Sequence, residues 1–359
     1  METGTARCRD YRLDTLRALS IVLVVLWHIQ PFRFSALTQD HISRIPQDLV
    51  SVFNYQLTLI GVPTFYLVSL YLFYSHLSST SSSTSSSYLW RRLRRLAKLF
   101  IFWTAVQVAV YFAVRMYGHY YPNVWLGFSQ RPVALFFVLG GPTLPLVGDP
   151  VFYFLVDLAI LTILAFLYAR INDKFRTPIG IAVILGSAIY FEVCHLYNIS
   201  IAYPRPDSFI IYVPIAYMLY HNDRLKKFWF VFLAGFILFS AHNIWLLKSD
   251  PSVYARLSIV FGAVAVFCTI YSLNLALTDR FTQFLARYSL GIFAIHKYWE
   301  LFFILFLTKA FSILNVNQSV TIFNIQFSFI YLIIGVCAVV FTLVCVKLLG
   351  HSRLKEYVS

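Results

Sequence analysis

Long apolar runs recur along the whole chain and are separated by short polar stretches. A helix needs about 20 apolar residues to cross the hydrocarbon core of a bilayer. Runs of this kind predict ten membrane-spanning helices, at residues 15–33, 49–74, 96–117, 151–169, 177–198, 208–221, 228–247, 253–277, 288–311 and 325–349. The pattern therefore predicts an all-α fold, a polytopic membrane helix bundle.

The basic residues of the loops predict the orientation of this bundle. With ten spans and an internal N-terminus, the cytoplasmic segments hold 17 lysines and arginines and the outer loops hold three. Such an excess is typical of cytoplasmic loops. The apolar segment 132–147 is interrupted by Gly and Pro, so we expect a re-entrant or interfacial piece there. An eleventh crossing at this point would place the basic loops 170–176 and 221–227 outside. Both termini are thus predicted to be cytoplasmic.

Composition agrees with a membrane protein. The 359 residues are 59% apolar and 12% charged, with a mean hydropathy of +0.72, whereas soluble domains are about 45–50% apolar and about 25% charged. The net charge of +14 is explained by the basic loops, so no nucleic acid partner is predicted. Five scattered cysteines without CxxC or Cys/His spacing predict neither a disulfide framework nor a zinc site.

The chain shows no internal repeat and no long soluble segment, so residues 1–359 are predicted to form a single membrane domain. The Ser/Thr-rich segment 78–87 is predicted to be a flexible cytoplasmic linker. The first apolar segment lacks a small-residue cleavage pattern and is expected to remain as a helix. A site must then lie among the helices.

The first predicted helix carries ionisable residues. Arg17 and His28 are eleven positions apart, which places them on nearly the same helix face, about 16 Å apart along the axis. Asp14 shares this face. A lone arginine at a membrane boundary is commonly a headgroup anchor, whereas ionisable residues at depth usually face a bundle interior or a watery cavity. For His28, a structural hydrogen bond and a catalytic role both remain open.

A run of four arginines precedes the third span, in the sequence RRLRR at 91–95. Within it, Arg92 and Arg95 share one helix face, and Arg91 and Arg94 share another. Basic runs beside membrane helices attract anionic lipid headgroups, and forked guanidinium groups also suit phosphate recognition. Composition alone favours the lipid contact over the phosphate site.

Four short motifs occur in order. They are LDTLRALSIVLVVLWH in the first span, GVPTFYLVSL in the second, RLRRLAK at the start of the third and YSLGIFAIH near the ninth. Their marked residues are Asp14, Arg17, His28, Gly61, Pro63, Phe65, Ser69, Arg92, Arg95, Ser289, Gly291 and His296.

These motifs resemble those of the acyltransferase-3 family of membrane acyltransferases, which modify cell-surface glycans and related acceptors. The resemblance extends from residue 13 to about residue 300. Two positions depart from the family pattern, because Leu70 stands where the second motif ends in glycine and Lys98 where a proline commonly follows the third. The C-terminal hydrolase-like domain that some members carry is not expected here.

The resemblance implies transfer of an acyl group, with acetyl preferred over succinyl, from cytoplasmic acyl-CoA to a hydroxyl of an exported glycan such as an exopolysaccharide or lipopolysaccharide. Acetyl-CoA is then a co-substrate and no bound cofactor is expected. The implied roles are phosphate binding for Arg17, Arg92 and Arg95, and general-base or nucleophilic catalysis for His28. The implied setting is a bacterial cytoplasmic membrane.

Supporting roles are expected for three further residues. Asp14 would orient Arg17, Ser289 belongs to the last motif, and His296 would orient the acyl group or acceptor, with a packing hydrogen bond as its alternative. Glu192 and His195 have a metal-compatible spacing but no further ligand, so no metal is predicted. A glycan-precursor transporter or flippase and a non-catalytic membrane scaffold remain alternative functions, although the repeated halves typical of transporters are not found.

Overall fold

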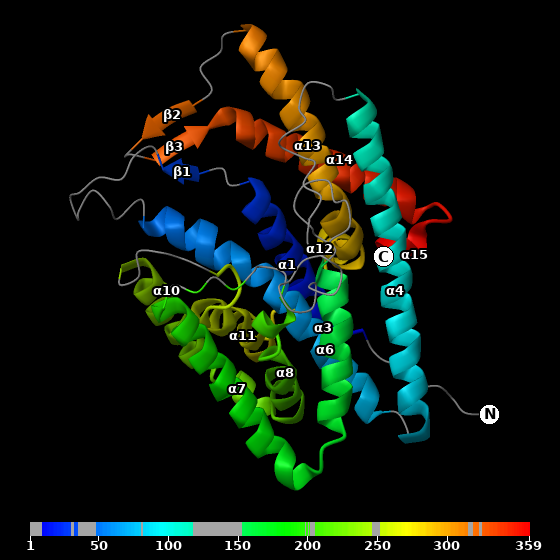
Figure 1. The fold of residues 1–359 in the computed structure, drawn as a ribbon, viewed down its shortest axis with the longest axis vertical. Coiled ribbons are helices and arrows are strands. Elements are labelled where there is room, and N and C mark those ends of the chain that lie inside the picture. The colour runs from blue at the N-terminus through cyan, green and yellow to red at the C-terminus, as the bar shows by residue number, and fades with distance from the viewer. Residues whose placement is uncertain are drawn as a thin grey trace.

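The computed structural model describes residues 9–29, 32–34, 48–79, 82–117, 153–197, 199, 201, 205–245, 252–314, 319–322 and 325–359. Within these ranges the chain is mainly helical, as predicted (Figure 1). The α-helices are α1 (Tyr11–Ile29), α3 (Gly61–Ser78), α4 (Ser82–Tyr117), α6 (Tyr153–Ala169), α7 (Asp173–Leu196), α8 (Tyr212–His221), α9 (Asp223–Lys226), α10 (Trp229–Trp245), α11 (Leu257–Ser272), α12 (Arg280–Arg287), α13 (Ser289–Leu314), α14 (Phe329–Gly350) and α15 (Lys355–Val358).

Three helical stretches of the described chain are long and apolar enough to cross a membrane, namely Asp48–Ser78, Asp173–Leu196 and Leu332–Gly350. The shorter apolar helices are Tyr153–Ala169, Trp229–Ile244 and Leu257–Ser272. The count of about ten crossings and the cytoplasmic location of both termini stay predictions.

A small antiparallel sheet accompanies the helices and was not predicted. It consists of β1 (Phe32–Phe34), β2 (Ser319–Ile322) and β3 (Ile325–Ser328), in the order β1–β3–β2, and lies near one end of α14 (Figure 1). The first and last predicted spans are therefore too long, because α1 ends at Ile29 and α14 begins at Phe329. The periodicity of a short apolar run fits a strand and a helix equally well. Whether such a run becomes a strand therefore depends on whether another segment is in place to pair with it.

The predicted linker at 78–87 is shorter than expected, because α4 already begins at Ser82. Arg170, which follows α6, donates a hydrogen bond from Nη2 to Ser86 Oγ at 3.0 Å. This contact ties the first turns of α4 to the end of α6. The predicted re-entrant segment 132–147 lies outside the described residues.

Helix α1 occupies the middle of the bundle. It contacts α3, α11, α12, α13 and α14, and Figure 1 shows it between α4 on one side and α7 and α10 on the other. Leu16 and Ile21 are almost fully buried. The polar residues of α1 therefore lie among other helices.

Helices α1 and α3 approach each other closely at Gly61. A Cβ atom at this position would lie 2.8 Å from the carbonyl oxygen of Ser20 and 3.1 Å from Val24 Cγ2. Just before Gly61, the helical stretch changes from a π-helix at Phe53–Leu57 to a 3₁₀ turn at Thr58–Ile60. Such interruptions inside helices are frequent at functional sites.

Gly61→Ala should destabilise the protein by about 1–3 kcal/mol, the usual range for overpacking, because the Ser20 carbonyl is backbone and cannot rotate away. The measurement is thermal unfolding of the purified protein in detergent. The matched control is Gly186→Ala on α7, where an added Cβ meets no atom within 4 Å and alanine is a better helix former than glycine. Equal losses in both variants would contradict the close α1–α3 approach.

Candidate active site

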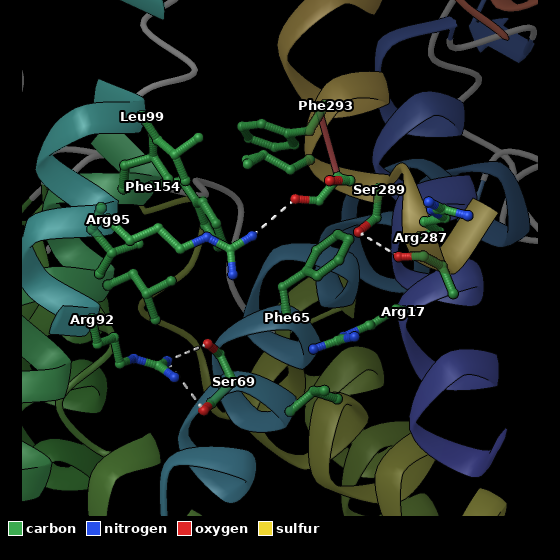
Figure 2. Close-up of a pocket in the computed structure, with 17 residues that line it drawn as sticks. Arg17, Phe65, Ser69, Arg92, Arg95, Leu99, Phe154, Arg287, Ser289 and Phe293 are labelled. Atoms are coloured by element: carbon green, nitrogen blue, oxygen red, sulfur yellow. Dashed lines mark hydrogen bonds between the residues drawn. The ribbon is translucent and has the colours of Figure 1, made fainter. Parts of the chain in front are cut away.

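A cavity of about 310 Å³ opens between α4, α3, α6, α1 and the α12–α13 junction. All three arginines predicted to bind phosphate line it, as does Ser289. Figure 2 shows Arg92 and Arg95 entering from α4, while Arg17 approaches from the opposite wall. Residues far apart in the sequence thus form one site.

A fourth arginine, Arg287 at the end of α12, also lines this cavity and was not predicted. Its signal in the sequence was its position two residues before the motif serine, Ser289. Helix α12 begins at a cap in which Thr282 N donates to Asp279 Oδ1 at 2.8 Å. The side-chain hydrogen bond from Thr282 holds the pKa of Asp279 below its usual range. The described lining of the cavity contains no carboxylate side chain, so the site is strongly cationic.

Arg92 is held by neutral partners. Its Nη2 donates to Ser69 Oγ at 2.7 Å and to the Ser69 carbonyl at 3.3 Å, and its Nε donates to Thr162 Oγ1 at 3.3 Å. The guanidinium carbon also lies 5.4 Å from the centroid of the Phe73 ring. These contacts fix the orientation of the side chain without neutralising its charge.

The other arginines of the run at 91–95 differ in whether they line the cavity. All three are exposed, but Arg95 lines the cavity, whereas Arg91 and Arg94 do not line it. Arg94 instead lies 5.9 Å from the centroid of the exposed Trp90 ring. Of the two pairs that share a face in the sequence, the structure directs Arg92 and Arg95 to the cavity.

Arg17 faces the cavity and forms no ion pair within the described residues. Asp14 Oδ2 accepts a hydrogen bond from Arg9 Nε at 2.5 Å, and the described chain shows no hydrogen bond between Asp14 and Arg17. The proposed orienting role of Asp14 therefore stays a prediction.

His28 lines a second, much smaller cavity of about 20 Å³. The described residues lining it are Val24, Trp27, His28, Thr58, Leu59, Val62, Tyr153, Tyr254 and Phe293. Phe293 lines both cavities. One phenylalanine ring is therefore a shared wall between the arginine cavity and the His28 cavity.

His296 lies beside His28, with 4.8 Å between the ring centroids. Its Nδ1 lies 3.0 Å from the Ile292 carbonyl, to which it can donate. Its buried Nε2 has no hydrogen-bond partner among the described residues. Ser289 uses its hydroxyl to donate to the Ala286 carbonyl at 3.1 Å.

Residues 355–359 are held against α4, and Ser359 lines the arginine cavity. Arg95 Nη2 donates to the Ser359 carbonyl at 2.9 Å (Figure 2), Lys98 Nζ lies 2.7 Å from Glu356 Oε1, and Trp103 Nε1 donates to the Tyr357 carbonyl at 3.0 Å. This tail was not singled out by any motif.

No metal site is found in the part of the chain that the structure describes, where no three His, Cys, Asp or Glu side chains gather. His195 has a second histidine nearby, since its ring centroid lies 6.4 Å from that of His242.

The fold and the site thus describe a helical membrane protein with a cationic cavity next to a half-buried histidine, His28. A family model described as an acyltransferase domain matches residues 10–347. The chain therefore belongs to the acyltransferase-3 family, and it is a membrane acyltransferase. Comparison with curated proteins finds no match, and comparison with solved structures finds none either.

Ser69→Ala should weaken CoA binding several-fold, because a hydrogen bond to a charged group contributes about 1.5–3 kcal/mol and part of that orients Arg92. Titration of the purified protein with CoA measures the effect. Ser75→Ala, on the same helix but outside the cavity lining, is the control and should bind like the wild type. Equal affinities in all three proteins would show that Ser69 does not position Arg92.

The Glu356 contact should be present at neutral pH. The hydrogen bond from Lys98 holds the pKa of Glu356 below its usual value of 4.5. A carboxylate with a lowered pKa stabilises the folded contact above its unfolded pKa and loses it as the pH falls through the folded pKa. Glu356→Gln should therefore speed hydrogen exchange in residues 355–359 at pH 7. The charge-swapped pair Lys98→Glu with Glu356→Lys should restore slow exchange; unchanged exchange in Glu356→Gln would argue against the contact.

Proposed function

We propose that the protein transfers an acyl group, acetyl in the first place, from acyl-CoA to a hydroxyl of an exported glycan. The observation that carries the proposal is the geometry of the two cavities. Four arginines line one of them, His28 lines the other, and Phe293 belongs to both.

The arginine cavity suits the phosphates of CoA. CoA carries several negative charges at one end of a long pantetheine arm that ends in the thioester. Arginine binds phosphate through forked, charge-assisted hydrogen bonds. No acidic side chain belongs to the described lining, so the guanidinium groups keep a positive charge that an anionic ligand can neutralise.

His28 would then meet the thioester at the far end of the arm. The acceptor hydroxyl oxygen bonds to the thioester carbonyl carbon, the C–S bond breaks, and CoA leaves as a thiolate. As a general base, His28 takes the hydroxyl proton and returns it to the sulfur. In the covalent route, the imidazole itself takes the acyl group first and passes it to the hydroxyl. Rapid denaturation at neutral pH during turnover of labelled acetyl-CoA separates the routes, since only the second leaves label on the chain.

The topology predicted from the loop charges supports an acceptor on the other side of the membrane from the donor. The predicted cytoplasmic loops hold most of the basic residues, and the arginine cavity lies at the predicted cytoplasmic mouth of α4. The acyl group would enter from the cytoplasm and reach a surface glycan such as an exopolysaccharide or lipopolysaccharide outside. We propose a bacterial cytoplasmic membrane as the setting of this route.

The test compares wild type, Arg92→Ala and His28→Ala with radiolabelled acetyl-CoA. Arg92→Ala should bind CoA at least about tenfold more weakly, because it removes hydrogen bonds to a charged ligand. His28→Ala should bind CoA with near wild-type affinity and turn over no acetyl-CoA.

Arg94→Ala is the matched control, because Arg94 belongs to the same run but is exposed and outside the cavity lining. It should bind CoA like the wild type. Equal losses in Arg92→Ala and Arg94→Ala would indicate a general electrostatic effect of the basic run. A folded wild type that binds no acyl-CoA would overturn the proposed function.

A further inference from the structure

We infer that the small cavity at His28 is an acyl pocket sized for acetyl, and that Phe293 divides it from the arginine cavity. The inference rests on the proposed function and goes beyond it, because it assigns the acyl group to named residues.

The volume of the cavity limits the acyl group. At about 20 Å³, it holds roughly one water-sized group, since a single water needs roughly 10–15 Å³ by the same measure. A methyl group is of similar size. The acetyl methyl therefore fits, and each further methylene would have to displace a wall.

The walls are packed and cannot yield easily. Val62 and Leu59 are 4% and 2% exposed, and Tyr153 is 1% exposed. Val62 lies one residue after Gly61, where α3 is pressed against α1. Displacing this wall would disturb the tight α1–α3 contact at Gly61.

The chemistry of the lining argues against succinyl. Apart from His28, the described lining is apolar, aromatic or hydroxyl-bearing, with no lysine or arginine. A succinyl carboxylate would be buried there without a cation, which is strongly unfavourable. Lys297, the residue after His296, does not line the pocket and pairs with Glu300 at 3.1 Å.

Phe293 fixes where the acyl pocket ends. It is 6% exposed, its ring centroid lies 5.4 Å from that of Phe154 and 6.2 Å from that of His296, and Figure 2 shows it at the edge of the arginine cavity. Among the described residues, Phe293 is the one that lines both cavities, so a thioester whose phosphates sit on the arginines would pass this ring to reach His28. The nucleotide and the acyl group are thereby kept in separate compartments.

The experiment measures kcat/KM of the 359-residue protein for acetyl-, butyryl- and succinyl-CoA. The rate is followed by the free CoA that forms from each thioester. Wild type should prefer acetyl-CoA over butyryl-CoA by more than tenfold, because one methylene in a tight pocket changes kcat/KM by about 10–200-fold. Val62→Ala should raise the butyryl-to-acetyl ratio about tenfold.

The matched control is Val264→Ala in α11, which removes the same atoms from a site that is 2% exposed and lines neither cavity. Its butyryl-to-acetyl ratio should equal that of wild type. A gain in ratio cannot arise from lost stability alone. Equal ratios in Val62→Ala and wild type, or a wild type that uses succinyl-CoA as well as acetyl-CoA, would overturn the inference while leaving the proposed function intact. A wild type that turns over no acyl-CoA would overturn both.

A second variant tests the same inference if Val62→Ala does not fold. Val62→Ile adds one methyl group to the pocket and should lower acetyl-CoA turnover at least tenfold, while the affinity for CoA without an acyl group stays within twofold of wild type. Retained CoA binding proves that the variant is folded. Unchanged acetyl turnover would show that the acyl group lies elsewhere.

Discussion

Both cavities depend on the tight packing of α1 against α3 at Gly61. Helix α1 presents Arg17 to one cavity and His28 to the other, and α3 supplies Val62 to the small cavity and Ser69 to the large one. An added Cβ at Gly61 would lie 2.8 Å from a backbone carbonyl of α1. Because Gly61 has no side chain, α1 and α3 can lie close enough together to line the same two cavities.

The electrostatics of the larger cavity follow from how its arginines are held. Arg92 is bound by the hydroxyls of Ser69 and Thr162 and by the Ser69 carbonyl, which orient a guanidinium without cancelling its charge. A carboxylate in those positions would have satisfied the cation and blocked anion binding. Charge that is oriented but not neutralised is the condition a phosphate site needs, and it costs stability until a ligand arrives.

The arginine cavity and the His28 cavity differ in size and in the polarity of their linings. At one end, cationic side chains and residues 355–359 border an open cavity; deeper in the helices, the space narrows to a volume near that of one water at His28. His296 lies against His28 and keeps Nε2 free of hydrogen bonds among the described residues. A polar, anion-binding entrance and a confined, largely apolar interior separate recognition of the donor from the transfer step.

Much of this could be read from the sequence, because apolar run length and short motifs are local properties. The helical class, the position of most helices, the pairing of Arg17 with His28 on one helix face and the motif of Ser289 and His296 all depend on spacing within a single element. The predicted boundaries of the first and last spans were wrong where the apolar run forms a strand, at β1 and β3. Periodicity over a few residues does not distinguish a strand from a helix.

The sequence by itself determined that this is a helical membrane protein of the acyltransferase-3 type with arginines and a histidine at fixed spacings. Only the tertiary structure decided which arginines work together. Arg91 with Arg94 and Arg92 with Arg95 are equivalent by spacing, and the packing of α4 against α6 directed the second pair to the cavity. Arg287 joined them across more than 190 positions of chain, and Phe293 became the wall between two cavities. These outcomes depend on how separate helices pack, and no local pattern specifies that packing.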